Sequence, residues 1–430
     1  MHHLIRVEQG AAYVARLSDN VEDPREARLA SELVAGVTRM RRWLDFVLSQ
    51  LVRGDYLALD PPLRQVLRIG AYDLLERETP PHAAVSEAVA TARIVSSRGG
   101  AALANGVLRT LARSMEDGTL PVPDTGKPAR DIAVRYSHPT WLVRRWLARY
   151  GEAETEALLQ ADNARPTFAL RVNALRTTTE GLGERLDALA VGWQPSAYLD
   201  DFLVVERLQP VLRAGLIEEG WCAVQDEAAG LVVRVLDPQP GETILDGAAA
   251  PGGKALYAAQ RMHNTGRLVA VDLHEARTAL VEQAAAARGL SIIEPVTADL
   301  RDYEAKTLFD RVLLDAPCTG LGVLAKRADL RWQRSPEDFA ELTDLQDRLL
   351  DAAARHVRPG GLLVYSTCTT EPEENAERVQ AFLDHNTAFA LEPVGDSVPE
   401  AMRTPEGFYA ALPHRHGTDG AFAARLRRET

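Results

Sequence analysis

The sequence contains little cysteine and no long apolar run. Its three cysteines, Cys222, Cys318 and Cys368, are too few and too scattered in 430 residues for a disulfide framework, and they lack the spacing of paired zinc ligands. We therefore expect thiols and no metal site. No apolar run approaches the roughly 18 residues that a membrane-spanning helix requires, and the N-terminus lacks the charged and apolar segments of a signal peptide. We expect a cytoplasmic protein without a membrane partner.

A positive net charge is also absent. The formal net charge is −12 at pH 7, which argues against a nucleic-acid partner when the chain is taken as a whole. The charge is uneven, however, because residues 1–135 sum to about +1 and residues 136–430 to about −13, so the total says little about a local groove. With 46% hydrophobic and 26% charged residues the composition is globular, and the length suffices for two or three domains.

Residues 1–114 are predicted to form an all-helical domain. Their helix-length apolar patterns are interrupted at proline-containing turns. The apolar residues of segments 64–76 and 84–95, Ile94 included, follow one helix face and are expected in the core. Arginines are frequent here and form either a phosphate-binding face or a solvated helix surface. They are Arg41, Arg42, Arg64, Arg68, Arg93, Arg98 and Arg109.

The rest of the chain predicts a linker and two further units. Residues 115–135 combine glycines and prolines without apolar periodicity, which indicates a linker. Residues 136–219 predict a small α+β unit, and residues 220–430 alternate strand and helix patterns in the manner of a doubly wound α/β sheet. Such sheets bind ligands at the carboxyl ends of their strands. The strands predicted for this sheet are residues 243–246, 268–272, 292–296, 311–315 and 362–365.

The first predicted strand of this sheet runs into a loop of small residues, ILDGAAAPGGK. Its glycines let the backbone approach a ligand closely, and the helix that follows presents free N–H groups at its N-terminus. The pattern is not that of a P-loop, so we expect a nucleotide-type or adenosyl-type ligand. The loop residues are Ala248, Ala249, Ala250, Pro251, Gly252, Gly253 and Lys254.

Two aspartates follow the next two predicted strands. Asp272 ends the second strand about twenty residues beyond the loop, where an acidic residue accepts hydrogen bonds from the hydroxyls of an adenosine ribose. Its alternative role is to cap the helix that starts near Glu275. Asp299, after the third strand, is the candidate for the adenine edge, and a turn-forming role is its alternative.

Two cysteines fall at the ends of the last two predicted strands. A buried cysteine alone is usually an inert small hydrophobe. Here, however, Asp315 and Cys318 in DAPC follow the fourth strand, and Cys368 in YSTC follows the fifth. Two thiols at one ligand-binding edge without a zinc-ligand set favour covalent chemistry over metal binding.

Three motifs together resemble the S-adenosylmethionine-dependent RNA (cytosine-5) methyltransferases. They are DGAAAPGGK, DAPCTGLGVL and YSTCTTEPEEN, in the order that this family has them. Further segments, YSHPTWLVRRW and LRVNALRTT, are similar to the element before the catalytic domain in the bacterial small-subunit ribosomal RNA methyltransferase B subfamily (RsmB, also called Sun or Fmu). That subfamily carries an N-terminal domain similar to NusB, which residues 1–114 resemble.

The resemblance implies a fold and a set of roles. The fold would be multi-domain, with an all-α NusB-like RNA-binding domain, a small α+β unit and a Rossmann-like methyltransferase domain. S-adenosylmethionine would bind residues 248–254, Asp272, Asp299 and Asp315. Cys368 would be the nucleophile that attacks the base, Cys318 would assist product release, and Asp315 would also stabilise the adduct. The substrate would be a cytosine of 16S ribosomal RNA, and we expect a monomer.

Two other functions stay open. A tRNA cytosine-5 methyltransferase would share the same motifs, because they specify the reaction better than the substrate. A non-catalytic NusB-like RNA-binding or ribosome assembly factor is the alternative from another class, against which the intact Asp315, Cys318 and Cys368 argue.

The sequence departs from the family pattern in two places. Ala248 and Ala255 stand where the family often has Cys and Thr, and both changes should leave cofactor binding intact. Ala325 and Ala328 stand where an Arg-rich, Pro-containing sequence is usual, which affects the RNA contacts expected of that loop. The acidic run 371–374 has no assigned role beyond a helix N-terminus favoured by the helix dipole.

Overall fold

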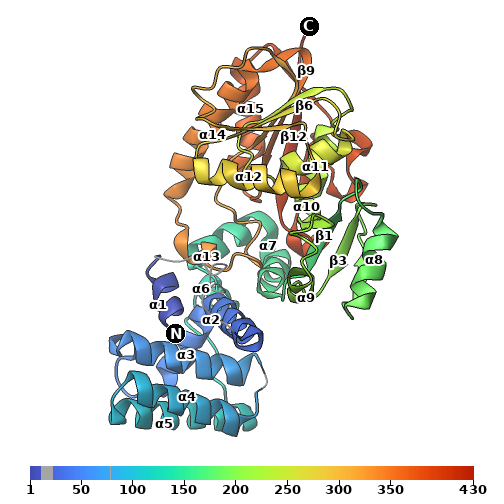
Figure 1. Cartoon of the computed structure of the whole chain (residues 1–430). Helices are drawn as coiled ribbons and strands as arrows, with labels where there is room; N and C mark the ends of the chain where they lie inside the picture. Colours follow the sequence, from blue (N-terminus) through green and yellow to red (C-terminus); the bar gives the residue numbers. More distant parts are fainter. Residues whose placement is uncertain (11–22, 78) are drawn as a thin grey trace. The chain divides into compact units, whose positions relative to one another are not determined.

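A computed structural model describes residues 1–10, 23–77 and 79–430 (Figure 1). These residues form two compact units. The helical unit comprises residues 1–164 together with residues 324–334, and the α/β unit comprises residues 165–323 and 335–430. Residues 11–22 and Glu78 belong to the predicted helical domain but lie outside the described residues. Within the described ranges, no helix is long and apolar enough to cross a membrane.

Four of the eight described α-helices of the helical unit begin at proline. Its helices are α1 His2–Glu8, α2 Pro24–Leu51, α3 Pro61–Leu75, α4 Pro81–Val95, α5 Arg98–Glu116, α6 Pro128–Arg135, α7 Thr140–Asn163 and α13 Leu330–Gln333. Proline suits the first helical position because its missing N–H has no partner there and its φ is already helical. The prolines that interrupt the apolar pattern are therefore helix starts.

The apolar faces of α2 to α5 enclose one core, as expected. Leu44, Leu67 and Leu108 are fully buried in it. The prediction for Ile94 is wrong, because this side chain is 84% exposed. The buried face of α4 carries Val85 and Ala92, and Ile94 lies two residues beyond that stripe, in the last turn of the helix.

The two compact units divide the chain at positions other than those of the predicted domains. The expected linker, residues 115–135, contains α6, and α7 from the expected α+β unit belongs with the helical unit. The reason is packing: Ile132, Leu142 and Trp146 on these two helices are buried. The described residues of the helical unit thus extend well past residue 114.

Residues 324–334 also belong to the helical unit, although they lie between two strands of the α/β unit in sequence. Arg39 donates a hydrogen bond to the carbonyl of Ala325 at 2.8 Å, and the indole of Trp332 donates to the carbonyl of Thr38 at 2.7 Å. Arg331 is completely buried and donates to the carbonyl of Asp162 and to Asn163.

This segment corrects the expectation for the AKRADLRW loop. Ala328, one of the two departures from the family pattern, is 1% exposed and packs inside the helical unit. A larger side chain at that position would meet packed neighbours. The residue there contributes to the interior, whereas Lys326 and Arg327 in the same loop are half-buried.

The α/β unit contains a small antiparallel sheet of four strands in the order β2-β3-β1-β4. Its strands are β1 Phe168–Val172, β2 Trp193–Pro195, β3 Phe202–Val205 and β4 Cys222–Val224, and its helices are α8 Thr179–Ala188 and α9 Gln209–Arg213. Leu170, Leu182 and Leu203 form its core. Since β4 pairs with β1, this sheet extends past the expected boundary at residue 219.

The large sheet has the order β10-β12-β9-β8-β5-β6-β7, with β11 pairing with β12. Strands β5 to β9 run parallel, and β12 lies antiparallel to β9. The strands are β5 Thr243–Asp246, β6 Arg267–Asp272, β7 Ile293–Thr297, β8 Phe309–Asp315, β9 Val357–Thr367, β10 Phe389–Glu392, β11 Tyr409–Ala411 and β12 Ala421–Arg428. The expected α/β fold class is confirmed, as a mixed sheet.

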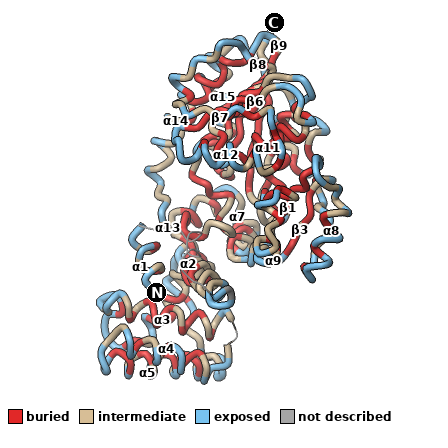
Figure 2. The backbone as a smooth tube through the Cα atoms, viewed as in Figure 1, coloured by how far each residue is buried: buried red, intermediate tan, exposed pale blue. Residues whose placement is uncertain are grey.

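Helices cover both faces of this sheet, and its strands are buried (Figure 2). Ile244 packs toward the cluster that includes Leu231 of α10 and Val281 of α12, whereas its neighbour Leu245 packs toward the cluster with Leu350 of α14. The helices are α10 Glu227–Leu236, α11 Gly253–Arg261, α12 Glu275–Arg288, α14 Asp338–Arg355, α15 Ala376–His385 and α16 Pro413–His416.

The order of the strands fixes the place of a site. The chain continues from β5 to β6 on one side, while β8 lies on the other side of β5. A crevice opens at such a switch point, outside the carboxyl ends of the strands. The loops after β5, β8 and β9 all leave this same edge of the sheet.

Candidate functional site

The loop after β5 is pinned between two strands. The N–H of Gly247 donates to the carbonyl of Leu313 in β8, and the N–H of Ala249 donates to the carbonyl of Val271 in β6. Gly252 has φ +105°, a left-handed conformation that favours glycine, and it directly precedes α11. This backbone, with α11 starting beside it, fits a ligand that approaches the N–H groups of a helix N-terminus.

Asp272 lies at the end of β6 and holds this loop. It is 5% exposed, and its carboxylate accepts the N–H of Ala250 and the N–H of His274, each at 3.2 Å. The guanidinium of Arg277 lies 3.3 Å away. The expected alternative, an N-cap of the next helix, is wrong, because His274 occupies the N-cap position and α12 starts at Glu275.

Asp299 forms the turn that was its alternative role. Its carboxylate accepts the backbone N–H and the Nε–H of Arg301, each at 2.9 Å. The hydrogen bond from Arg301 lowers the pKa of Asp299. The carboxylate is therefore ionised and partly exposed after β7, on the same side of the sheet as Asp272.

Lys254 and Asp315 join the loop after β5 to the end of β8. The ammonium of Lys254 donates to Oδ2 of Asp315 at 2.7 Å, and the hydroxyl of Ser366 donates to Oδ1 at 2.8 Å. Burial alone lowers the pKa of Lys254, but the charge and the hydrogen bond of Asp315 outweigh it, so the pKa is raised. Cys368 also favours the charged ammonium, which places a cation close to this sulfur.

A second carboxyl group lies behind this ion pair. Asp246 is 2% exposed, and its Oδ1 accepts only a long hydrogen bond, 3.4 Å, from the N–H of Ala248. Burial and the nearby charge of Asp315 raise the pKa of Asp246 to about 7. No local feature of the sequence distinguishes Asp246 from an ordinary aspartate at the end of a strand.

The structure brings the two cysteines of the motifs together. The sulfur of Cys318, after β8, lies 3.3 Å from the sulfur of Cys368, after β9. The hydrogen bond to Cys368, burial and the charge of Glu374 raise the pKa of Cys318. Cys318 is thus held as a thiol that donates toward Cys368. Among the described residues, no group of three or more His, Cys, Asp or Glu is placed to hold a metal ion.

The third cysteine lies elsewhere. Cys222 belongs to β4 of the small sheet and is completely buried in the core of that sheet. Burial raises its pKa to about 12. It is a packed apolar residue with no link to the pair of sulfurs.

Glu374 is a site residue that the sequence did not reveal. Its buried carboxylate accepts the N–H of Thr319 at 2.8 Å, the hydroxyl of Thr319 at 2.5 Å and the amide of Gln346 at 3.0 Å. Thr319 follows Cys318, and Glu374 lies six residues after Cys368, so this carboxylate links the two cysteine loops. Its place, in the short 3-10 helix Pro372–Glu374, explains the acidic run better than a helix dipole does.

Glycines bring the same loops into close contact. The N–H of Gly322 donates to the carbonyl of Cys368 at 3.1 Å, and the N–H of Gly420 donates to the carbonyl of Gly322 at 2.7 Å. A Cβ on Gly322 would lie 2.7 Å from the oxygen of Gly420 and 2.8 Å from that of Cys368. A side chain at this position would force the backbones apart.

Arg171 connects the small sheet to the loop after β5. Its guanidinium is fully buried, donates to the carbonyl of Gly253 at 2.7 Å and also bonds the side chain of Gln225. Burial lowers its pKa to about 9. The sequence signal that contained this residue was LRVN, which resembled a family segment without indicating a contact to the loop.

Three stretches of the chain match models of known protein families. Residues 233–427 match the model of the 16S rRNA methyltransferase RsmB/F family, residues 4–113 match the NusB family, and residues 138–212 match a ferredoxin-like domain of RsmF/B-like methyltransferases. A probable ribosomal RNA small subunit methyltransferase B of Bacillus subtilis (strain 168) is 34% identical over 99% of this chain and 97% of its own length.

A second relative and two solved structures are also similar to this chain. The ribosomal RNA small subunit methyltransferase B of Serratia proteamaculans (strain 568) is 33% identical over 94% of this chain and 90% of its own length. The crystal structure of PH0851 matches 96% of this chain and 92% of its own chain with a TM-score of 0.79 and 29% identity. A methyltransferase homolog protein from Pyrococcus horikoshii matches 70% of this chain and 99% of its own, with a TM-score of 0.61 and 28% identity.

The pKa of Asp246 leads to a testable dependence of stability on pH. The folded pKa of about 7 exceeds the ordinary 3.8, so the folded state keeps a proton that the unfolded chain releases. Stability should therefore fall as pH rises from about 4 to about 7, by up to ~1.4 kcal/mol per pH unit. Asp246→Asn should remove this loss and unfold at higher urea concentration than the wild type at pH 8, but not at pH 4. Exposed Asp302→Asn is the control, and parallel pH curves for wild type and Asp246→Asn would contradict the expectation.

The contacts of Glu374 lead to a second prediction. Glu374→Ala removes the acceptor of the buried N–H of Thr319 and one of two acceptors of the Gln346 amide, the other being the carbonyl of Pro317. This should cost about 2 to 4 kcal/mol of unfolding free energy. Glu374→Gln keeps one acceptor oxygen and should lose less. Urea unfolding gives the ranking, and hydrogen exchange should accelerate in peptides covering residues 316–322. Glu377→Gln, an exposed change three residues on, is the matched control. Equal stability of Glu374→Ala and wild type would show that the carboxylate does not hold the loops.

Proposed function

Because the chain belongs to the 16S rRNA methyltransferase RsmB/F family, we propose that it methylates carbon 5 of a cytosine in 16S ribosomal RNA, with S-adenosylmethionine as methyl donor. The observation that supports this reaction best is the 3.3 Å separation of the sulfurs of Cys318 and Cys368. Two thiols beside a loop suited to an adenosyl ligand match a reaction that makes and breaks a bond between protein and base.

The reaction needs a nucleophile because carbon 5 of cytosine reacts poorly on its own. The thiolate of Cys368 adds to carbon 6, and the electrons of the 5,6 double bond move so that carbon 5 becomes enamine-like and takes the methyl group. The sulfur of Cys318 lies 3.3 Å from that of Cys368, and the ammonium of Lys254 interacts electrostatically with Cys368. The base must leave its stack for the sulfur to reach it.

The remaining steps restore the aromatic base. Asp315 reaches the N3 and N4 edge of the cytosine, accepts a hydrogen bond from the N4 amino group and stabilises the adduct. The proton on carbon 5 then leaves, the 5,6 double bond reforms, and the bond between Cys368 and carbon 6 breaks. Cys318 assists this step as the acceptor of the proton. Cys318 is a thiol in the free protein, so it must first lose its own proton to solvent water once the base has separated it from Cys368. That proton is the one released per methyl group transferred, and Cys318 ends as a thiol again.

The residues around the loop fit S-adenosylmethionine. The backbone of residues 248–254 approaches without bulky side chains, and the buried carboxylate of Asp272 lies where a ribose binds in such sheets. Asp299 is ionised after the next strand, and Asp315 completes the cofactor set. When bound, the cofactor supplies the methyl group. Residues 248–254 and Asp272 would hold the cofactor at the same edge of the sheet as Cys368.

Ribosomal RNA is favoured over tRNA by the relatives. The relatives from Bacillus subtilis and Serratia proteamaculans are named for the small ribosomal subunit, and residues 4–113 match the NusB family. The resemblance to the RsmB subfamily implies cytosine 967 of 16S rRNA as the target, and we propose the equivalent nucleotide. Such a substrate implies a cytoplasmic protein, and we propose that it acts as a monomer.

A direct experiment tests this function. Purified protein, S-adenosylmethionine and a 16S rRNA transcript should yield one 5-methylcytosine, read by bisulfite sequencing at the position equivalent to 967. A tRNA pool serves as the alternative substrate in parallel. Methylation of tRNA alone would establish the alternative function, a tRNA cytosine-5 methyltransferase. No transfer to any cytosine-containing RNA would favour the non-catalytic assembly factor.

The two sulfurs should behave differently when each is removed. Cys368→Ala should abolish transfer, by at least about a thousandfold, because no covalent activation of carbon 5 is possible. Cys318→Ala should instead accumulate a protein–RNA adduct that survives denaturing electrophoresis, since the bond to carbon 6 forms but is not released.

The third cysteine provides the control. Cys222→Ala should change transfer little, because its side chain is buried in the small sheet. An adduct in Cys368→Ala, rather than in Cys318→Ala, would reverse the assignment. Full activity of Cys368→Ala would exclude this sulfur as the nucleophile.

A further inference from the structure

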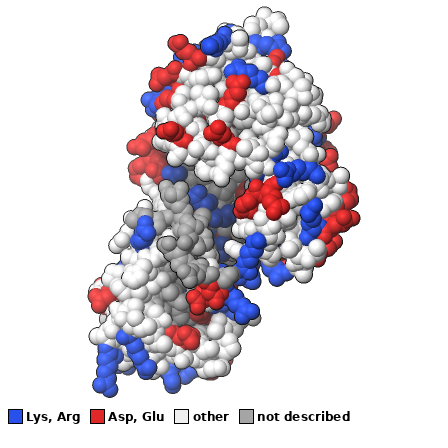
Figure 3. Space-filling view, viewed as in Figure 1, with Lys and Arg blue, Asp and Glu red and all other residues white. Residues whose placement is uncertain are grey.

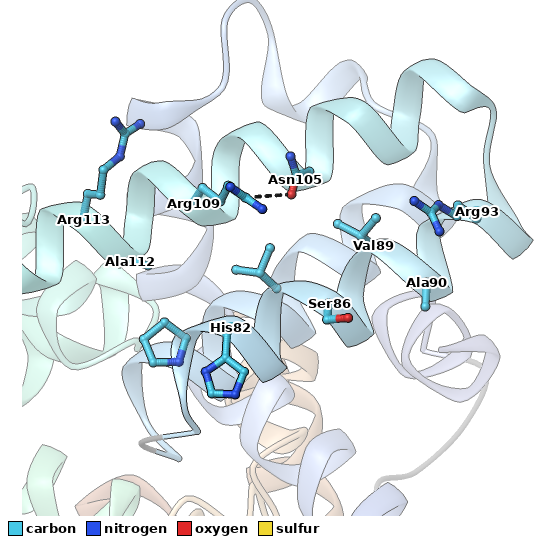
Figure 4. A pocket seen from close by; sticks show the side chains of 11 residues that line it. His82, Ser86, Val89, Ala90, Arg93, Asn105, Arg109, Ala112 and Arg113 are labelled. Atoms are coloured by element: carbon cyan, nitrogen blue, oxygen red, sulfur yellow. Dashed lines mark hydrogen bonds between the residues drawn. The ribbon is translucent and has the colours of Figure 1, made fainter.

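A groove lies on the helical unit, away from the pair of sulfurs in sequence. It runs between α4 and α5 with a volume of about 770 Å³. Figure 4 shows that His82, Ser86, Val89 and Arg93 come from α4, and that α5 supplies the opposite wall. The floor is apolar, because Val85 and Ala112 are buried there.

The walls of the groove are positive. Arg93 lies on α4, and Arg109 and Arg113 lie on α5, all with exposed side chains. No aspartate or glutamate lines the groove. Arg109 is oriented by a 3.0 Å hydrogen bond to the side chain of Asn105, which leaves its terminal nitrogens available (Figure 4).

Other arginines of this unit are used within the fold. Arg68 is buried against Asp45 and Glu8, and Arg64 lies 3.6 Å from Glu8. Arg42 donates to the carbonyl of His138 and to Thr140.

The arginines that the sequence grouped as one possible phosphate-binding face therefore separate into two sets. For Arg93, Arg109 and Arg113 the structure gives no carboxylate partner among the described residues. Lys and Arg side chains also appear along the edge of the helical unit where α4 and α5 lie (Figure 3).

We propose that the groove between α4 and α5 binds a single-stranded stretch of the substrate RNA through its sugar–phosphate backbone. This proposal rests on the proposed function, and it adds a second contact to the RNA outside the catalytic crevice. Arg93 and Arg109, on opposite walls, bind phosphate oxygens. The apolar floor accommodates ribose and base faces, and Ser86, Asn105 and His82 supply hydrogen bonds to the 2′-hydroxyls.

The composition of the groove favours RNA over an acidic protein segment. A protein anchor usually fills a deep apolar pocket with a large side chain. This floor consists of small and medium residues, Val85, Val89 and Ala112, between exposed guanidinium groups. Guanidinium planes stack on unpaired bases as well as bind phosphates, so the same residues serve a splayed single strand.

Binding of full-length protein to a 16S rRNA transcript tests the proposal. The double variant Arg93→Ala/Arg109→Ala should weaken binding about tenfold or more at low salt. The slope of log Kd against log salt concentration should fall by about 1 to 2, because two phosphate contacts are lost. The matched control is Arg28→Ala/Arg53→Ala, which removes two exposed arginines of the same unit outside the groove.

Crosslinking gives an independent measurement. RNA carrying 4-thiouridine should crosslink to wild-type peptides from residues 81–95 and 98–116, and these crosslinks should disappear in the groove variant. Thermal unfolding of the variant should match that of the wild type, because both substituted side chains are exposed.

The outcomes separate this proposal from the proposed function. Binding lost in the groove variant but kept in the control supports the groove even if the wild-type protein methylates no cytosine. Unchanged RNA binding, or an equal loss in groove variant and control, overturns it. Unchanged RNA binding would also leave a protein segment as the occupant of the groove.

Discussion

One buried carboxylate holds together the two loops on which the candidate site depends. Glu374 accepts three hydrogen bonds, two from Thr319 and one from Gln346. A buried carboxylate without donors would be very costly, so these contacts are also the condition for its burial. Because Thr319 adjoins Cys318 and Glu374 closes the turn after Cys368, the separation of the two sulfurs follows from this arrangement. The parallel strands bring the loops to the same edge, and the carboxylate with its donors fixes the distance between them.

Charges at the same edge are arranged in layers. The ammonium of Lys254 and the hydroxyl of Ser366 each donate a hydrogen bond to the carboxylate of Asp315. Asp246 lies behind them, and its pKa is about 7. Two ionised carboxylates this close would compete for one ammonium. Keeping Asp246 protonated below about pH 7 leaves Lys254 to Asp315 and to the nearby sulfur. The site therefore keeps one ammonium, paired with Asp315, that also interacts with Cys368.

Much of this was predictable from local sequence, and the rest depends on distant contacts. Strand ends at Asp272, Asp315 and Cys368 follow from apolar runs followed by polar residues, and parallel strands then bring them to one edge. The role of Glu374 depends on donors 28 and 55 residues away, which no local pattern encodes. The burial of Ala328 depends on a segment leaving one unit for the other, and a helical periodicity cannot reveal that. The prediction that Ile94 is buried is wrong for a simpler reason, because an apolar residue in the last turn of a helix has few neighbours to cover it.

Residues 324–334 belong to the helical unit but lie between two stretches of the α/β unit in sequence, and this limits how the chain can be cut into fragments. The chain enters the α/β unit once, leaves it two residues after Gly322, and returns at Ser335. A fragment cut before the small sheet would keep this segment without Thr38, Arg39 and the α7 residues that surround it. Arg331 would then be a cation without its acceptors, joined directly to the loop of Cys318. The family models match the two parts separately, but a single cut would not divide this chain into its two compact units.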